Sequence, residues 1–203
     1  MFDSSDFSII RGIVIDAVKN SGIAKSGLQE TSIKEDGSVV TQTDHFLQNT
    51  ISKKLYDRWP DIPFMGEEMA HEQQVDIVNA KKSQFWTLDP LDGTTNFSMG
   101  FPFYGVSLAL IKNGEAEFGI VYDPIRDECF YAISGEGAFL NNQRIKTVST
   151  GIELGDCVAS VDLKRLVGQL ADRLVRFPPY RAQRNLGAYV LEWCWVASGR
   201  IQL

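Results

Sequence analysis

The feature that most constrains this chain is an apolar run that ends abruptly in two carboxylates. Residues 84–97 read QFWTLDPLDGTTNF, so that Asp89 and Asp92 follow a stretch with the length and composition of a buried strand. Ionised carboxylates are costly to bury unless they are paired or coordinated, and Gly93 lets the backbone turn sharply straight after them. The pattern predicts a strand whose end carries polar chemistry.

Four segments carry apolar residues at helical spacing, which predicts helices. They are residues 5–20, 41–59, 162–175 and 187–200. Thr43 or Asp44 is expected to cap the second helix, because a short oxygen-bearing side chain accepts hydrogen bonds from the free amides of a first turn. The third helix is expected to bury one leucine-rich face. The fourth is apolar nearly all round and is expected to lie buried.

The remaining segments read as strands and turns. Residues 61–68, DIPFMGEE, predict a short strand that ends in two acids, and residues 31–40 predict a loop or a short hairpin. Residues 104–145 alternate β-rich runs with turn signals, of which Asn113-Gly114 is a strong hairpin signal. Helices, an antiparallel meander and further helices together predict a layered α+β fold.

Composition narrows the classes of partner and compartment. The chain has 203 residues and a net charge of −6, so that wholesale binding to nucleic acid or to an anionic membrane is not expected. No stretch approaches the roughly 18 apolar residues of a membrane span, and the first residues do not resemble a signal peptide. The three cysteines are far apart and are expected to be buried thiols in a reducing compartment. We therefore expect a cytoplasmic protein.

The chemistry at the strand ends suggests a hard divalent cation. Such cations prefer oxygen ligands, and the side chains of Asp89 and Asp92 and the carbonyl of Leu91 could supply three. If the two acid-tipped strands lie side by side, Glu67 and Glu68 would join a cluster able to hold more than one Mg²⁺. Such an acidic protein can still bind an anionic substrate through the metal.

The residues after the acids suggest a place for a phosphate. The backbone amides of Gly93, Thr94 and Thr95 are expected to open a helix, whose free N–H groups attract anions. Acids, metal ions and a phosphate cradle together indicate metal-assisted hydrolysis of a phosphate ester. Taken singly, Asp-Gly and Glu-Glu pairs are more typical of turns and solvated surfaces, so the prediction rests on the combination.

At this point the sequence resembles a known family. GEE followed by WTLDPLDGTTNF and FPFYGVSLAL is similar to the inositol monophosphatase family of Mg²⁺-dependent, lithium-sensitive phosphatases. The segments DGSVVTQTD, GIVYDPIRDECFYAISGEGAFLNNQRI and QRNLGAYVLEWCWVASGR resemble its lid, its meander and its substrate pocket. The resemblance covers nearly the whole chain and implies a five-layered αβαβα sandwich, as in fructose-1,6-bisphosphatases, that often forms a homodimer.

The resemblance assigns roles to the acids and their neighbours. Glu67, Asp89 and Asp92 match metal-binding side chains, and Leu91 matches a backbone carbonyl ligand, for two or three Mg²⁺ ions. Thr94 matches the residue that pairs with an acid to orient and deprotonate the attacking water. Glu67 is also expected to position a metal-bound water.

The partner of Thr94 and the contacts to substrate follow from the same resemblance. Asp44, in TQTD, matches the acid that pairs with the threonine. Lys34 matches the lid, and Gly187 matches a glycine near the substrate ring. The resemblance assigns substrate contacts to a wider set, which is Lys34, Asp92, Gly93, Thr94, Thr95 and Gly187. The substrate is expected to be a small phosphorylated polyol or sugar, and the resemblance favours inositol monophosphate, hydrolysed to inositol and phosphate.

The chain departs from the family pattern at its end. Family members continue past the segment ASGR, residues 197–200, and supply a further carboxylate in a Trp-Asp-x-Ala-Ala-Gly motif. No Trp-Asp pair occurs in this sequence. We therefore expect one phosphatase-like domain over residues 1–203 that lacks the family's C-terminal part. Residues 1–150 would hold the metal site, and residues 151–203 would begin a second α/β portion.

Other functions remain open at this stage. Aspartyl-phosphate enzymes of the haloacid dehalogenase type place two acids two residues apart on one side of a strand, whereas Asp89 and Asp92 are three apart with Pro90 between them. A truncated relative could act as a non-catalytic binding module. Within the family, the alternative substrates are fructose 1,6-bisphosphate, histidinol phosphate and nucleotide phosphates, because the motif selects a phosphate ester and not its alcohol.

Overall fold

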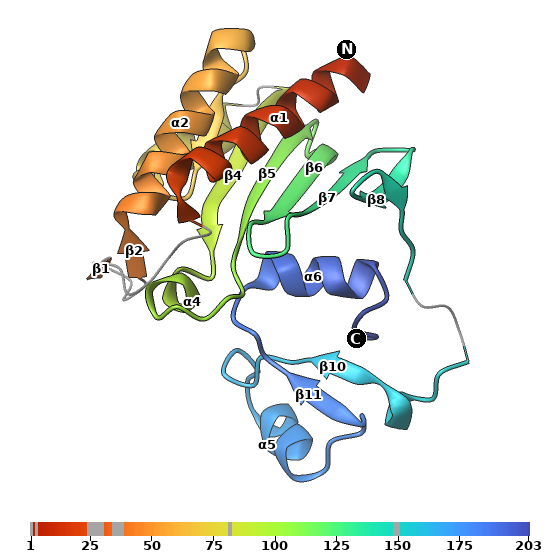
Figure 1. The fold of residues 1–203 in the computed structure, drawn as a ribbon. Helices are drawn as coiled ribbons and strands as arrows, with labels where there is room; N and C mark the ends of the chain where they lie inside the picture. Colours follow the sequence, from red (N-terminus) through yellow and green to blue (C-terminus); the bar gives the residue numbers. More distant parts are fainter. Residues whose placement is uncertain (1, 3, 24–30, 34–38, 81–82, 148–150) are drawn as a thin grey trace.

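The computed structural model describes residues 2, 4–23, 31–33, 39–80, 83–147 and 151–203. Figure 1 shows how the elements are arranged in space. In chain order they are α1 (Ser4–Ser21), β1 (Thr31–Ile33), β2 (Val39–Thr41), α2 (Gln42–Arg58), β3 (Phe64–Gly66), α3 (His71–Asn79), β4 (Gln84–Asp92), α4 (Thr94–Ser98), β5 (Gly105–Lys112), β6 (Glu115–Asp123), β7 (Glu128–Ile133), β8 (Gly137–Leu140), β9 (Gln143–Arg144), the 3₁₀ helix η2 (Leu154–Asp156), β10 (Val158–Ser160), α5 (Gln169–Arg176), β11 (Ala182–Arg184) and α6 (Tyr189–Ala197).

Seven strands form the main sheet in the order β3-β4-β5-β6-β7-β8-β9. Only the β3–β4 pair is parallel, and the other neighbours are antiparallel. The predicted meander is confirmed. Asn113 and Gly114 form the tight turn between β5 and β6, both with positive φ, which matches the twist of a two-residue hairpin. Residues 31–33 and 39–41 pair as a short antiparallel ladder, in agreement with a hairpin.

The elements stack in five layers (Figure 1). Helices α1 and α2 cover one face of the main sheet, and α6 lies on the opposite face. Beyond α6 lie the parallel strands β10 and β11, and then α5. The layered αβαβα prediction is therefore confirmed. The predicted division near residue 150 falls on residues 148–150, which lie outside the described residues, and it remains a prediction.

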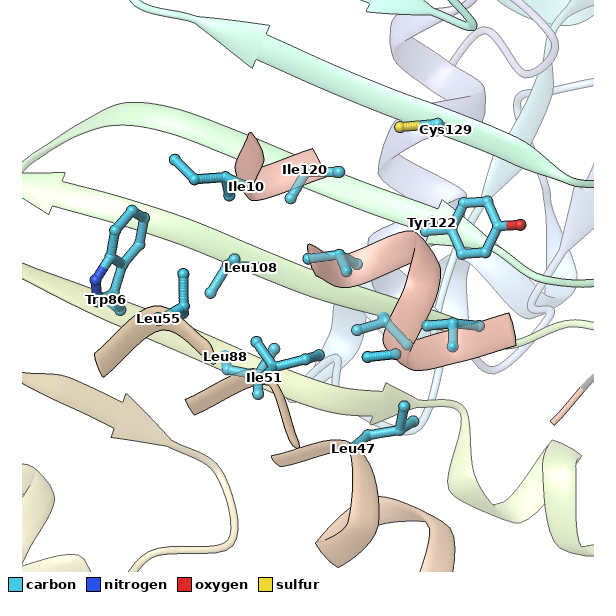
Figure 2. Packing of buried hydrophobic residues seen from close by; sticks show 14 of the residues in the cluster. Ile10, Leu47, Ile51, Leu55, Trp86, Leu88, Leu108, Ile120, Tyr122 and Cys129 are labelled. Atoms are coloured by element: carbon cyan, nitrogen blue, oxygen red, sulfur yellow. The ribbon is translucent and has the colours of Figure 1, made fainter. Parts of the chain in front are cut away.

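The main hydrophobic core lies between the helix pair and the sheet, and Figure 2 shows its packing. The helical stripe predicted for α2 is confirmed, because Leu47, Ile51 and Leu55 are almost fully buried. They face sheet residues such as Trp86 and Leu88 (Figure 2). Full burial of one such side chain contributes about 2 kcal/mol. This core fixes the end of β4 relative to the start of α2, and both positions recur in the site below.

The predicted cap of α2 is wrong. The capping residue is Thr41, whose side-chain oxygen accepts a hydrogen bond from the amide of Thr43 at 3.2 Å. Asp44 is the third residue of the helix, and its Oδ2 accepts from the Thr41 amide at 2.8 Å. The two side chains thus form a reciprocal capping box. The helix begins at Gln42, two residues before Asp44, and the second carboxylate oxygen of Asp44, Oδ1, is left to face the site.

Two predictions for the C-terminal helices are also wrong. The third helix begins at Gln169 and not at residue 162, because the backbone at Gly168 (φ 67°, ψ −149°) is not helical. Val167, within the range predicted for this helix, is 88% exposed. Helix α6 is not buried all round, because Trp193 is 72% exposed. Leu191, on its other side, is fully buried and packs beside Phe103.

The exposed side of α6 borders an apolar groove. The groove has a volume of about 470 Å³ and lies between α6 and the face of strands β5 to β8. Its walls include Ala109, Ile120, Phe139 and Trp193. The second face of the main sheet is therefore covered only in part, in contrast to the face under α1 and α2.

Two predictions from composition can be compared with the structure. Among the described residues, no helix combines the length and the apolarity that a crossing of the bilayer would require. The three cysteines are free thiols, of which Cys129 and Cys157 are buried and Cys194 is partly buried. Burial raises the pKa of Cys129 to about 11, so that its thiol is neutral and inert near neutral pH.

Candidate active site

Parallel pairing of β3 and β4 brings the acid-tipped strand ends together. Gly66 pairs with Leu88, and the Glu67 amide donates to the Leu88 carbonyl at 3.0 Å. Glu67 and Asp89 consequently interact through their carboxyl groups. The pKa of Asp89 is raised well above its ordinary value, first by burial and then by the negative charges of Glu67 and Asp92.

Asp92, the last residue of β4, connects the sheet to α6. Its Oδ2 accepts a hydrogen bond from the amide of Val190 at 2.7 Å. Burial raises the pKa of Asp92 to about 6, against the opposing effect of the Val190 hydrogen bond, and the charges of Glu67 and Glu192 raise it further. The site thus concentrates carboxylates that destabilise one another's charged forms.

This donor set suits a hard cation. The charged neighbours that raise the pKa values of Asp89 and Asp92 are all carboxylates, and a divalent cation relieves such repulsion through oxygen ligation. Within the described part of the chain, no three His, Cys, Asp or Glu side chains already stand as a closed metal-binding group. The acids lie near enough to raise one another's pKa values, but their side chains would have to adjust to ligate one ion together.

A hydroxyl lies between two elements of the site. The Oγ1 of Thr94 is 2.9 Å from the Leu91 carbonyl and 3.3 Å from Oδ1 of Asp44. Asp44 is 1% exposed, and its burial raises its pKa, while hydrogen bonds from Thr41 and Thr94 lower it. A carboxylate with a raised pKa is a better proton acceptor. The structure thus brings together the two residues for which the sequence predicted a shared role.

The turn after the acids requires glycine. Gly93 has φ 89°, and a Cβ at this position would lie 3.0 Å from both the Phe103 carbonyl oxygen and the Ala188 Cβ. Helix α4 begins directly afterwards at Thr94, as the sequence predicts. Thr95 in its first turn is exposed. Close packing at Gly93 therefore holds the start of α4 against the segment that precedes α6.

Sequence reasoning missed two residues that hold this segment in place. Asn96 Nδ2 donates to the carbonyls of Phe103 and Leu186, each at 2.7 Å. Glu192, 4% exposed, accepts from the amides of Leu186 and Gly187 at 2.9 and 3.0 Å. Asn96 lies within the motif, but its partners are remote in sequence, so no local signal could have assigned them.

Three other residues were predicted to belong to the site. Lys34 lies outside the described residues. Glu68 is partly buried, and its amide donates to Gln48 Oε1 at 2.9 Å. Gly187 is exposed and has φ 78°. A Cβ added to it would lie 3.2 Å from the side-chain amide of Asn96. The structure therefore places Gly187 beside Asn96 and Glu192, next to the acids.

Replacement of Gly187 by alanine should destabilise the protein by about 1 kcal/mol, because its positive φ disfavours a side chain and the new Cβ would press on Asn96. Urea unfolding measures the change. Gly12→Ala, at an open position inside α1, is the control and should stabilise by about 0.5 kcal/mol. If both substitutions raised the free energy of unfolding by the same amount, Gly187 would not be in a constrained position.

Known proteins resemble this chain in sequence and in fold. Residues 7–203 match the sequence model of the inositol monophosphatase family. Inositol monophosphatase 1 of Solanum lycopersicum is 35% identical over 95% of this chain and 73% of its own length. The fructose-1,6-bisphosphatase/inositol-1-monophosphatase of Thermotoga maritima is 35% identical over 80% of this chain and 60% of its own length.

The solved structures agree with the sequence matches. The crystal structure of the extragenic suppressor protein suhB from Bartonella henselae superposes with a TM-score of 0.80 at 31% identity. That match covers 95% of this chain and 76% of the suhB chain. A family match over nearly the full length, the same fold and the acidic strand ends lead to one conclusion: the chain belongs to the inositol monophosphatase family of phosphoric monoester hydrolases.

Proposed function

We propose that this protein hydrolyses inositol monophosphate to inositol and phosphate by means of Mg²⁺-activated water. The observation that carries the proposal is the convergence of the strand-end acids with the hydroxyl of Thr94, which hydrogen-bonds to Asp44. The names of relatives at about one third identity support the substrate. Family membership also argues against the aspartyl-phosphate type of phosphatase, which the spacing of Asp89 and Asp92 already disfavoured.

The family is metal-dependent, and four groups of this chain would hold the cation. They are the carboxylates of Glu67, Asp89 and Asp92 and the carbonyl of Leu91. All are oxygen donors, as Mg²⁺ prefers, and the like-charge repulsion among the acids favours its binding. Bound Mg²⁺ supplies a water of lowered pKa and neutralises phosphate charge. Asp92, which accepts a hydrogen bond from the Val190 amide, would hold its share of the cation near α6.

Thr94 and Asp44 would handle the proton of the attacking water. A hydroxyl has one proton, so Thr94 donates either to the Leu91 carbonyl or to Asp44 at any moment. If a cation held the Leu91 carbonyl, the Thr94 hydroxyl would donate its proton to Asp44. Its lone pairs would then be free to orient the attacking water, whose proton would pass through Thr94 to the buried carboxylate of Asp44.

The test is phosphate release from inositol 1-phosphate, measured with and without Mg²⁺. We expect release that depends on Mg²⁺ and that is absent in the Asp89→Asn variant. Release that persists in Asp89→Asn would contradict the proposed ligand set. If no release occurs while Mg²⁺ still binds by calorimetry, the chain acts as a metal-binding module, the non-catalytic alternative.

A second substrate merits a parallel assay. One relative at 35% identity is named as both a fructose-1,6-bisphosphatase and an inositol-1-monophosphatase, so fructose 1,6-bisphosphate is the main alternative. The ratio of kcat/KM for the two esters decides between them. A ratio in favour of inositol 1-phosphate supports the proposal, and the opposite ratio would assign the enzyme to the sugar phosphate.

Removal of the Thr94 hydroxyl should slow the reaction more than it weakens metal binding. For Thr94→Ala we expect kcat to fall about 100-fold, a magnitude typical of lost general-base assistance, with the Mg²⁺ affinity changed by less than about threefold. Thr50→Ala, on α2 and six residues after Asp44, is the control. A proportional loss of kcat and Mg²⁺ affinity would speak against a water-orienting role.

Two further expectations belong to this proposal. We propose that the protein forms a homodimer, which sedimentation velocity can test at several concentrations. We also propose a reducing, cytoplasmic location, because its three cysteines are free thiols. Fractionation of cells that express the protein would test the location. A monomer at all concentrations, or recovery outside the cytoplasm, would contradict the respective expectation.

A further inference from the structure

The segment that leads into α6 lies against the acids of the candidate site. The Val190 amide donates to Oδ2 of Asp92 at 2.7 Å. The Asn96 side chain donates to the Leu186 carbonyl, also at 2.7 Å. Tyr189 lies between these two contacts in the sequence and is the first residue of α6. Since consecutive Cα atoms are about 3.8 Å apart, Tyr189 is one residue away from a group that touches the Asp92 carboxylate.

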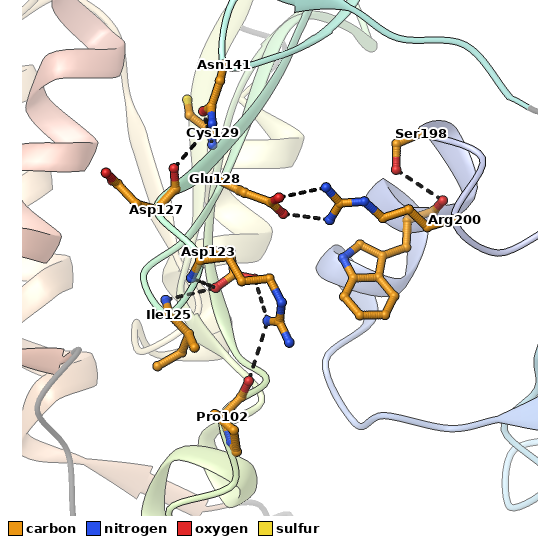
Figure 3. Close-up of polar contacts among 11 residues, drawn as sticks. Pro102, Asp123, Ile125, Asp127, Glu128, Cys129, Asn141, Ser198 and Arg200 are labelled. Carbon is orange, nitrogen blue, oxygen red and sulfur yellow. Dashed lines mark hydrogen bonds and ion pairs between the residues drawn. The ribbon is translucent and has the colours of Figure 1, made fainter.

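Helix α6 is also held at its other end. Arg200, three residues beyond the helix, binds Glu128 of β7 through two hydrogen bonds of 2.6 Å (Figure 3). Leu191, on one side of the helix, is fully buried beside Phe103. A helix that is fixed at both ends and along one side keeps the backbone of its first residue in place. Tyr189 therefore has a defined position relative to the acids.

The Tyr189 side chain belongs to a polar cluster at the ends of two strands. Its hydroxyl donates to Oδ2 of Asp162, which lies two residues after β10. The side-chain amide of Asn185, the residue after β11, donates to the same carboxylate. The Nε of Arg165 lies 3.5 Å from Asp162 Oδ2, and its guanidinium lies 4.6 Å from the Tyr189 ring centre. We call these four residues the Tyr189 cluster.

The place of the Tyr189 cluster in the fold is typical of a ligand site. Strands β10 and β11 run parallel, and open parallel sheets bind ligands outside the carboxyl ends of their strands. From the end of β11 the chain passes through residues 185–188 to the start of α6, which contacts Asp92 at the end of β4. The cluster therefore lies where the second sheet meets the acid-tipped end of β4.

The Tyr189 cluster offers hydrogen-bond acceptors. A phenol has one proton, which Tyr189 gives to Asp162, and its oxygen keeps two lone pairs. The Asp162 side chain is 13% exposed, and the hydrogen bond from Tyr189 holds the pKa of its carboxyl below the ordinary value. This carboxylate is therefore charged near neutral pH. Its ion-pair partner Arg165 is 75% exposed, so water screens much of that positive charge.

We infer that Tyr189 and Asp162 contact the alcohol part of the substrate and select the monophosphate of a neutral polyol over a bisphosphate. This role rests on the proposed function, in which the strand-end acids and their cation hold the phosphate that is cleaved. Hydroxyl groups of a polyol would donate to Tyr189 and Asp162. A second phosphate group would bring a charge of about −1.5 to −2 and three acceptor oxygens, which the same two residues would repel.

Asp162→Asn tests the role of the charge. Asparagine keeps the size of the side chain but leaves Arg165 without its carboxylate partner. We expect the ratio of kcat/KM for inositol 1-phosphate to kcat/KM for fructose 1,6-bisphosphate to fall at least about tenfold, because a like-charge repulsion is removed. Asp156→Asn is the matched control, since Asp156 also pairs with an arginine, Arg181, but precedes β10. It should leave the ratio unchanged within about twofold.

Tyr189→Phe tests the role of the hydroxyl. We expect KM for inositol 1-phosphate to rise about fivefold, as for one lost hydrogen bond. The kcat/KM for p-nitrophenyl phosphate, which carries no hydroxyl group, should stay within about twofold. The Mg²⁺ affinity measured by calorimetry should not change. Tyr180→Phe is the control, because the Tyr180 hydroxyl donates to Gln183 at 3.0 Å in a separate cluster of buried residues.

Each outcome separates this role from the phosphatase activity itself. Turnover of p-nitrophenyl phosphate with unchanged selectivity in Asp162→Asn and Tyr189→Phe would overturn the role and leave the proposed function intact. An equal loss of kcat/KM for all the esters, or a preference of the unchanged protein for fructose 1,6-bisphosphate, would overturn it as well. If the unchanged protein hydrolyses none of the esters, the proposed function fails and this role fails with it. Urea unfolding verifies the fold of each variant, and Tyr189→Phe decides alone if Asp162→Asn does not fold.

Discussion

Asp92→Asn should abolish Mg²⁺-dependent phosphate release while the fold stays intact. We expect turnover to fall by at least about 1,000-fold. Loss of a charged ligand weakens the binding of Mg²⁺, and the bound cation lowers the activation barrier by several kcal/mol. The fold should tolerate the change because asparagine keeps a carbonyl oxygen for the Val190 amide, which Asp92 accepts at 2.7 Å.

Three measurements test this prediction. Calorimetry gives the Mg²⁺ affinity, phosphate release gives the turnover, and urea unfolding gives the stability. Asp57→Asn removes an exposed acid from α2 and should match the unchanged protein in all three. Normal turnover in Asp92→Asn would refute the ligand role, and a lost fold would show that the Val190 contact needs the charge.

Asn96→Ala should produce the largest loss of stability that we predict for a single polar side chain. The Asn96 amide donates to the carbonyls of Phe103 and Leu186 at 2.7 Å each. Removal leaves two partly buried carbonyls without this donor, at about 1–2 kcal/mol each, so the free energy of unfolding should fall by about 3 kcal/mol. The segment that carries Gly187 would loosen as well, which should raise KM for the substrate more than it lowers kcat.

Urea unfolding and steady-state kinetics on the same preparation test both parts of this prediction. Asn79→Ala, at the exposed end of α3, is the control and should change the free energy of unfolding by less than about 0.5 kcal/mol. A stability loss as small as that of the control would mean that Asn96 does not hold the segment. An unchanged KM despite lost stability would separate this contact from substrate binding.

Local patterns in the sequence predicted the parts of the fold that are built from neighbouring residues. The stripe of Leu47, Ile51 and Leu55 gave α2, and the Asn113–Gly114 turn placed the hairpin of β5 and β6. Two strands that both end in acids indicated the cluster of Glu67 with Asp89, and their parallel pairing brings these residues together. In each case the residues that determine the structure belong to one element or to two short, paired elements.

The remainder of the site depends on contacts between distant parts of the chain. The Val190 amide reaches Asp92 across 98 positions, and the Asn96 side chain reaches Leu186 across 90. No periodicity reports such contacts, because they follow from how α6 docks onto the sheet. Helix propensity also failed where a single residue decided the outcome, as at Gly168, whose backbone leaves the helical region despite the leucine-rich sequence around it.

The apolar groove beside α6 determines how the protein should behave in the test tube. Its walls have little polar character, and Trp193 at its margin is 72% exposed. Excluded salts such as sulfate strengthen contact between surfaces of this kind. We therefore expect the chain to salt out readily, to brighten an anilinonaphthalene dye in its native state and to stay dispersed best in dilute buffer of low ionic strength. The colloidal behaviour of the protein is thus set by which face of the sheet the helices leave open.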